Sequence, residues 1–258
     1  MTSISTSDRP KIDETSFEDP YAPTLPPTQD ELPYDDDISM ETQRHKLQMD
    51  LLIEVLYPWL ENREDGYVGG NMFVYFSLQQ VRDRDFRGPD FFAVVGVPKT
   101  ERKSWVVWEE GKAPDVVIEL LSESTAQADK TKKKRIYQER LRVPEYFWYD
   151  PFDAEDWAGF ILRDGQYEPM ERDENDRFWS ERLGLWLVKW QGTYGGVNAT
   201  WLRWETPDGV LLRTGWEEAT LAHENLDRAQ QEATQARARA ERLAARLQDL
   251  GIDPEELS

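Results

Sequence analysis

The sequence predicts an α/β domain with a mixed sheet flanked by helices, followed by a C-terminal coiled-coil helix. Between residues 39 and 151, one helix pattern, three strand patterns, a second helix pattern and a fourth strand pattern follow one another, which is the order of a small domain whose sheet is covered by helices. Residues 115–122 are apolar along their length, as in a strand covered on both faces. From residue 216 onward, apolar residues alternate three and four positions apart, which is the spacing of a coiled coil.

The chain divides into three parts by composition. Residues 1–38 are rich in Pro, Asp, Glu, Ser and Thr and hold few large apolar residues, so we expect an acidic, disordered tail that cannot build a core. We place the folded domain at residues 39–215 and the coiled coil at residues 216–258.

Two helices are predicted within the domain. Residues 39–62 form an amphipathic pattern in which Leu47, Leu51 and Val55 recur at helical spacing. Residues 125–142 have the composition of a second, strongly basic helix.

The strands are predicted from short runs of aromatic and β-branched residues between turn residues. The Asp164-Gly165 pair predicts the turn of a hairpin within residues 159–170. The other expected strands are 69–78, 90–97, 115–122, 143–151, 183–190, 199–205 and 209–215.

Composition excludes several kinds of site. The chain has no cysteine, which excludes disulfides, thiolate metal sites and a cysteine nucleophile. Only two histidines, His45 and His223, are present, which argues against a multi-histidine zinc site. No apolar run reaches the roughly 18 residues of a membrane span, and the N-terminus lacks the apolar run of a secretory signal. We therefore expect a cytoplasmic protein that does not contact a membrane.

The net charge of -20 repels nucleic acid at long range, because phosphate contacts need local Lys and Arg. Residues 129–142 oppose this charge, since they contain seven basic residues against Asp129 and Glu139. Within them, Lys130, Lys132 and Lys134 are our candidates for contacts with nucleic acid. The alternative is that these lysines form a solvated helix face.

Two carboxylates stand next to or within apolar strands. Asp90 follows a Gly-Pro pair at the start of one strand pattern, and Glu119 lies inside another. If the strands are neighbours, the two groups repel each other unless a cation joins them. Mg²⁺ is a hard cation that takes oxygen ligands, and it can polarise a phosphoryl oxygen and acidify a water molecule. Two other readings remain: Asp90 caps a turn, and Glu119 forms a structural salt bridge.

These residues also carry a family resemblance. The motif GPD, followed after an insertion by PDVVIELLSEST, by a D…K…Y spacing and by VPEYFWYDP, resembles the bacterial restriction-endonuclease family of the PD-(D/E)xK nuclease superfamily. The resemblance covers Thr42 to Pro151 well and extends more loosely through the tryptophan-rich segments beyond. It implies a restriction-endonuclease-like fold and a metal-dependent nuclease acting on DNA. The implied cofactor is Mg²⁺ or Mn²⁺, with Asp90, Glu119 and the backbone carbonyl of Leu120 as its ligands.

The catalytic lysine departs from the superfamily pattern. Leu121 occupies the position two residues after Glu119 where the E-x-K motif has its lysine. The resemblance implies that the lysine has moved to the following helix, where Lys133 matches the family's D…K…Y spacing. Asp129 and Tyr137 share its helical face at i−4 and i+4. We expect Lys133 to orient a water molecule or to offset charge in the transition state, with its two lysine neighbours as rivals.

The first helix supplies two accessory candidates. His45 occupies a place where the family often has histidine, and it either lines the cleft or lies on the helix surface. Glu54 is a further candidate for approaching the metal. Asp129 and Tyr137 complete the accessory set.

The C-terminal pattern predicts self-association. Its seam consists of Ala219, Ala222, Leu226, Ala229, Ala233, Ala236, Ala240, Leu243, Leu247 and Leu250. A homodimer through this seam would bring two active sites to one duplex. The alternative is a single helix that folds back on the domain.

The function predicted from the sequence is Mg²⁺-dependent hydrolysis of DNA phosphodiester bonds. Two alternatives remain open. The first is a catalytically inactive nuclease fold that binds protein through the coiled coil and an aromatic surface, since the chain has 11 tryptophans. The second is a phosphohydrolase that does not act on nucleic acid.

Overall fold

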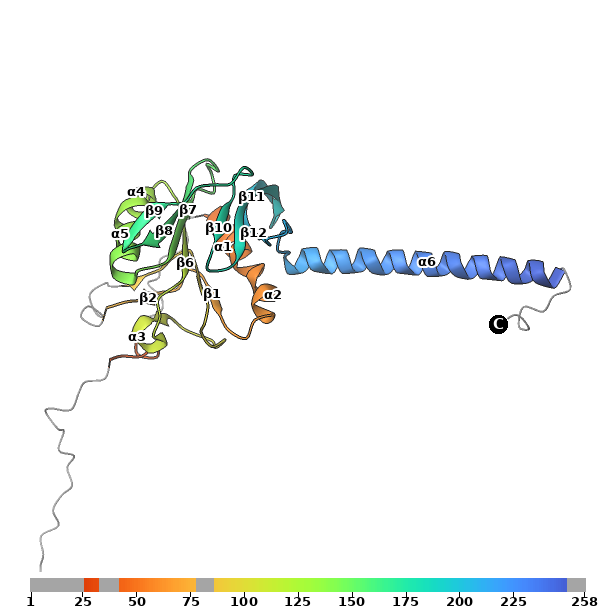
Figure 1. Cartoon of the computed structure of the whole chain (residues 1–258), viewed down its shortest axis with the longest axis horizontal. Coiled ribbons are helices and arrows are strands. Elements are labelled where there is room, and N and C mark those ends of the chain that lie inside the picture. The colour runs from red at the N-terminus through yellow and green to blue at the C-terminus, as the bar shows by residue number, and fades with distance from the viewer. Residues whose placement is uncertain (1–25, 33–41, 78–85, 250–258) are drawn as a thin grey trace, which may run out of the picture.

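A six-stranded mixed sheet lies at the centre of the domain (Figure 1). The structure is a computed structural model in which residues 26–32, 42–77 and 86–249 are described. Strands β6 and β7 are parallel, and the other neighbouring strands are antiparallel. In spatial order the strands are β1 (Tyr67–Gly69), β4 (Phe91–Val94), β6 (Val116–Leu120), β7 (Glu145–Tyr149), β8 (Trp157–Arg163) and β9 (Gln166–Pro169).

Two three-stranded sheets accompany the central one. One sheet is entirely antiparallel and contains β10 (Phe178–Ser180), β11 (Leu185–Tyr194) and β12 (Val197–Glu205). The other contains β3 (Phe86–Arg87), β2 (Val74–Tyr75) and β5 (Trp105–Val106).

The helices precede, connect and follow the strands. The N-terminal pair is α1 (Gln43–Glu54) and α2 (Leu56–Glu61), and the short α3 (Val107–Glu110) follows β5. In the connection from β6 to β7, residues 126–141 are helical and include two π-helical segments. Its parts are α4 (Ala126–Ala128), η2 (Asp129–Lys133), α5 (Lys134–Ile136) and η3 (Tyr137–Leu141). The last element within the described residues is α6 (Gly215–Asp249).

The two faces of the central sheet have different covers. Ile118 and Leu120 face a core shared with α1 and the β10–β12 sheet. Val117 faces a second core, which includes Tyr137 and Leu141 of η3. All five residues of β6 are buried, as expected for a strand covered on both sides. Since side chains alternate along a strand, Glu119 points to the side of the helical connection.

Most predicted elements of the domain are present, so the predicted α/β class is confirmed. The hairpin at Asp164-Gly165 joins β8 to β9. The strand expected at 209–215 is wrong, because this segment contributes only an isolated bridge between Glu205 and Leu211. A Pro207-Asp208-Gly209 turn precedes it, which leaves too few residues to extend the pairing before α6 begins.

Part of the predicted tail packs against the domain. Leu32 is buried beside Phe73 and Val106, and the Trp108 indole N–H donates to the carbonyl of Pro27 at 2.9 Å. Residues 26–32 are therefore attached to the domain, whereas 1–25 and 33–38 lie outside the described residues. None of the helices in the described ranges combines the length and apolar character that crossing a bilayer requires.

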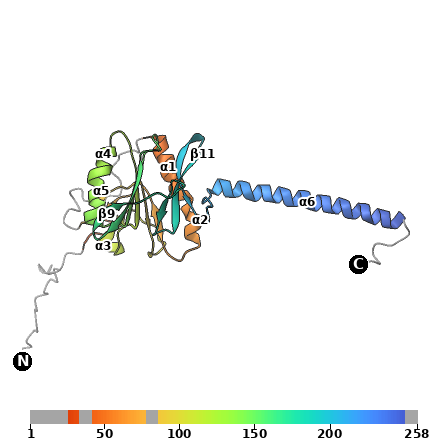
Figure 2. The same cartoon turned by 45° about the horizontal axis from the view of Figure 1, so that its top comes forward.

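Helix α6 leads away from the domain as a single long rod, and both views agree on this (Figures 1 and 2). A long C-terminal helix was predicted and is confirmed, and the alternative in which it folds back on the domain is wrong. The last residues of the predicted coiled coil, 250–258, lie outside the described part of the chain.

Candidate active site

Asp90 and Glu119 converge because of the register between two neighbouring strands. In the antiparallel pair β4–β6, Phe91 lies opposite Ile118, so one further step places Asp90 opposite Glu119. Directly opposed residues have Cβ atoms about 5 Å apart. The two carboxyl groups affect each other's pKa, and Asp90 Oδ2 accepts the backbone N–H of Leu120 at 2.7 Å.

The helical connection adds a cation to these carboxyl groups. The Lys133 ammonium lies 3.0 Å from Glu119 Oε2 and 2.7 Å from Asp129 Oδ1. The Tyr137 hydroxyl donates to Glu119 Oε1 at 2.6 Å. Both oxygens of Glu119 are therefore held by side chains from one helix face, which is the face expected from the i−4 and i+4 spacing around Lys133.

Burial shifts the proton affinity of this cluster. It raises the pKa of Glu119 to about 8 and that of Asp90 to about 6, and the charge of Lys133 opposes both shifts. Burial alone would lower the pKa of Lys133, but the Glu119 and Asp129 carboxylates raise it above its ordinary value. The lysine therefore stays charged, and of the two carboxyl groups Glu119 is the one whose raised pKa favours the protonated form at neutral pH.

The cluster has the donor chemistry that a hard divalent cation needs. Glu119 and Asp129 are fully buried, and Asp129 Oδ2 has no hydrogen-bond partner among the described residues. Three carboxyl groups around one ammonium leave negative charge uncompensated. The side chain of Lys133 is 25% exposed and Asp90 is partly exposed, so the cluster is reached from solvent on their side.

Protein side chains alone do not complete such a metal site. Within residues 26–32, 42–77 and 86–249, no three His, Cys, Asp or Glu side chains are grouped so that they could hold a metal ion. Mg²⁺ commonly takes only one or two carboxylates and completes its shell with water and substrate phosphate. The residues therefore fit Mg²⁺ with Asp90 and Glu119 as its protein carboxylates.

His45 of α1 contacts Leu121, the residue that follows β6. Its side chain is buried and does not lie on the surface. Its Nε2–H donates to the carbonyl of Leu121 at 2.9 Å, and its Nδ1 lies 2.8 Å from Thr42 Oγ1. Leu121 itself is fully buried. A lysine at this E-x-K position would have to be accommodated in the core.

The structure does not bring Glu54 to the cluster. Its Oε2 accepts the Tyr194 hydroxyl at 2.8 Å and its Oε1 accepts the backbone N–H of Gly215 at 3.0 Å. Glu54 is nine residues after His45, and nine steps of about 100° place the two on opposite helix faces. The expectation that Glu54 approaches the metal is therefore wrong.

The three lysines proposed to contact nucleic acid have different surroundings. Lys130 pairs with Asp156 at 2.5 Å. Lys134 lies over the Phe160 ring at 3.2 Å from its centroid, and burial lowers its pKa. Lys132 is exposed on the same helix. It is therefore the best placed of the three to contact phosphate, and this role stays a prediction.

Arg87 is a cation near the cluster that the sequence analysis did not single out. It lies in β3, three residues before Asp90, and its charge lowers the pKa of Tyr137 against the effects of burial and Glu119. Its position just before the GPD motif was the available signal in the sequence.

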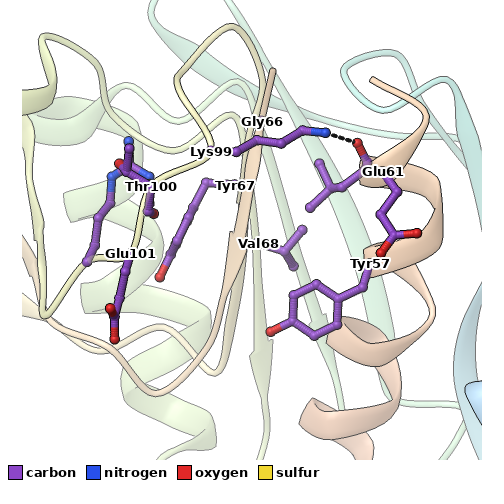
Figure 3. A pocket seen from close by; sticks show the side chains of 10 residues that line it. Tyr57, Glu61, Gly66, Tyr67, Val68, Lys99, Thr100 and Glu101 are labelled. Atoms are coloured by element: carbon purple, nitrogen blue, oxygen red, sulfur yellow. Dashed lines mark hydrogen bonds between the residues drawn. The ribbon is translucent and has the colours of Figure 1, made fainter. Parts of the chain in front are cut away.

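A pocket of about 420 Å³ lies elsewhere, between α2, β1 and residues 99–102 (Figure 3). Its cations are already paired: Lys99 donates to the carbonyl of Leu60 at 2.5 Å, and Arg102 binds Glu110 with two hydrogen bonds. None of the site residues predicted from the sequence lines this pocket.

Comparisons with known proteins found a matching family model and a similar solved structure. A family model described as "Putative restriction endonuclease", the Uma2 family, matches residues 31–190. A crystal structure described as a "putative nuclease" from Anabaena variabilis is similar, with 17% identity and a TM-score of 0.39 over 63% of this chain and 80% of that one. No curated protein matches. Because the family model covers more than half of the sequence and spans the whole Asp90–Lys133 cluster, the chain belongs to the Uma2 family.

Proposed function

We propose that the protein is a Mg²⁺-dependent DNA endonuclease whose catalytic residues are Asp90, Glu119 and Lys133. The observation that carries the proposal is the convergence of these three side chains in one buried, negatively charged cluster that opens to solvent. Family membership supports it. Mn²⁺ has the same preference for oxygen ligands and would substitute for Mg²⁺.

The carboxyl groups of Asp90 and Glu119 would hold the cation, together with the backbone carbonyl of Leu120. When bound, the cation would polarise a phosphoryl oxygen and acidify an attacking water molecule. The hydrogen bonds from the backbone of Leu120 and from Tyr137 fix the carboxylate orientations in advance. Such fixed oxygens avoid reorganisation at the moment of reaction.

Lys133 would act as a permanent cation and not as a base. Its neighbours keep the pKa of its ammonium above the ordinary value, so it does not accept a proton at neutral pH. It can donate a hydrogen bond to the attacking water or to a phosphate oxygen. Asp129, which lies 2.7 Å from the same ammonium, positions it.

Cleavage of supercoiled plasmid tests this proposal. The wild type should nick the plasmid with Mg²⁺ or Mn²⁺ and should be inactive in EDTA. The variants Asp90→Ala and Glu119→Ala should not nick. Glu54→Gln is the matched control, since Glu54 lies on the opposite face of α1, and it should cleave like the wild type. Equal nicking by Asp90→Ala and the wild type would defeat the proposal.

A non-catalytic interaction protein is the second candidate, and the exposed seam of α6 favours it. The net charge of -20 also weakens association with nucleic acid at long range. An absence of nicking by a folded wild type that nevertheless self-associates would select this candidate.

A further inference from the structure

Helix α6 presents an apolar seam that nothing in the described chain covers. Its 35 residues run from Gly215 to Asp249, and none of its described side chains is buried. Leu226 and Leu243 of the seam are 55% and 56% exposed. A helix of this kind gains most of its stability from burying such a face against another element.

The base of α6 is fixed to the domain, so the helix has a defined direction. Arg203 of β12 is fully buried and binds Glu217 through two hydrogen bonds of 2.7 and 2.8 Å. Thr214 Oγ1 accepts the backbone N–H of Glu217, and Glu54 accepts that of Gly215. These contacts hold the seam away from the domain and available to a partner.

The charges of α6 are distributed unequally along its length. Between residues 216 and 232 there is one arginine, Arg228, among the acidic residues Glu217, Glu218, Glu224, Asp227 and Glu232. Between residues 233 and 247 there is one acidic residue, Glu241, among the arginines Arg237, Arg239, Arg242 and Arg246. The half next to the domain is therefore acidic, and the far half is basic.

We infer that α6 pairs with the α6 of a second copy of this chain, and that the two helices run antiparallel. In this arrangement the basic half of each helix lies beside the acidic half of the other. A parallel pair would place acidic half beside acidic half. It would also bring together two domains of a chain whose net charge is -20, which is unfavourable through self-repulsion.

The seam fits an antiparallel pair over its whole length. When Leu226 of one copy packs against Leu243 of the partner subunit, Ala233 meets the partner's Ala236 and Ala222 meets the partner's Leu247. The positions that flank the seam then place Glu232 beside the partner's Arg239, twice per dimer. Flanking pairs of opposite charge set orientation in coiled coils.

A groove at the base of α6 lies on the face of the helix that points away from the seam, because Glu217, Thr220 and Glu224 line it. The groove has a volume of about 540 Å³, and its lining includes Val210, Trp216 and Leu221. Trp216 is 75% exposed and Val210 is 48% exposed. A partner helix that packs along the seam therefore leaves this groove uncovered.

The arrangement separates the two candidate active sites. A helix of 35 residues is about 50 Å long at about 1.5 Å per residue, and each domain lies at the opposite end of the pair. The dimer would therefore not bring both sites to one position on a duplex, as a side-by-side dimer would. This inference does not depend on whether the site cleaves DNA.

Single cysteines test the orientation, and the chain has no native cysteine to interfere. We expect a dimer in analytical ultracentrifugation of the wild type. Leu226→Cys and Leu243→Cys, with a tag on one of them, should form a disulfide-linked heterodimer when mixed and oxidised, and neither should cross-link alone. Glu224→Cys, which points away from the seam, is the control and should not cross-link. A monomeric wild type, or cross-linking of each seam variant with itself, would overturn the inference.

A charge exchange tests the same orientation without altering the seam. Glu232→Arg should weaken the dimer about ten-fold, since two attractive pairs become repulsive. Adding Arg239→Glu should restore the affinity, whereas adding Arg237→Glu should not. Restoration by Arg237→Glu instead would indicate a parallel pair and would overturn the antiparallel arrangement.

Discussion

The Lys133 ammonium lies 3.0 Å from Glu119 Oε2, although the two residues belong to different elements and are separated by 14 positions in the chain. A strand supplies the carboxylate and the following helical connection supplies the cation. The same face of that connection supplies Tyr137, which holds the other oxygen of Glu119. This contact joins the acidic and basic parts of the candidate site.

Replacing Lys133 should separate catalysis from metal binding. In Lys133→Met the cleavage rate at saturating Mg²⁺ should fall about 100-fold or more, since removal of a single charge-stabilising donor has effects of that size. Lys132→Met is the control, because Lys132 is exposed on the same helix. It should reduce DNA affinity at most and leave the rate on bound DNA unchanged. An equal loss of cleavage rate in both variants would mean that Lys133 contributes only to the positive charge of the helix and not to catalysis.

Removing the Tyr137 hydroxyl should destabilise the protein. Tyr137→Phe takes a 2.6 Å hydrogen bond from a buried carboxyl group, and the free energy of unfolding should fall by about 2 kcal/mol. Tyr149→Phe removes a hydrogen bond to the carbonyl of Thr200, for which a loss of about 1 kcal/mol is expected. Urea unfolding of both variants in EDTA measures the difference. A smaller loss for Tyr137→Phe would contradict the geometry.

Glu145 should contribute a pH dependence that is independent of the candidate active site. Burial raises its pKa to about 7, while the Ser180 hydroxyl and the Arg182 backbone N–H, which donate to it, act in the opposite direction. Because the pKa of Glu145 is higher in the folded state than its ordinary value of 4.5, the protonated group stabilises the fold fully below about pH 4.5. This stabilisation is lost as the pH rises through about 7.

The size of this contribution is about 3 kcal/mol, from about 1.4 kcal/mol per pKa unit. In Glu145→Gln the free energy of unfolding should therefore change less between pH 5 and pH 8 than in the wild type. Unfolding in urea at a series of pH values, with EDTA present, measures how the free energy of unfolding of each protein depends on pH. The same pH dependence in both proteins would show that Glu145 does not cause it.

The sequence predicted the central part of the site because local patterns determined it. Asp90 begins one strand and Glu119 lies inside the next strand of the sheet, so antiparallel pairing of the two was enough to bring them together. Lys133 followed from the family resemblance, and helical spacing within one continuous segment placed Asp129 and Tyr137 on its face. The roles of these residues in catalysis and metal binding stay predictions.

Other features depended on contacts that no local pattern encodes. The separation of nine positions between His45 and Glu54 places the two side chains on opposite faces of α1, and the sequence does not show which face meets the sheet. The attachment of residues 26–32 rests on single contacts such as Leu32 with Phe73. The short β10 has three residues, too few for a strand pattern to be recognised.

The direction of α6 could not be predicted for the same reason. An alanine-rich seam suits both packing on the domain and pairing with a second helix. The ion pair between the buried Arg203 and the partly exposed Glu217 distinguishes the two arrangements, because it fixes the base of the helix so that α6 leads away from the domain.

Mn²⁺ binding, followed by electron paramagnetic resonance, tests the central claim most directly. The wild type should bind at least one ion per chain at a site formed by Asp90 and Glu119, more tightly at pH 8.5 than at pH 6, because burial raises the pKa of both groups and protons compete with the metal. Asp90→Asn and Glu119→Gln should each lose that ion, and Glu54→Gln should retain it. Mn²⁺ binding that is unchanged in both Asp90→Asn and Glu119→Gln would contradict the account.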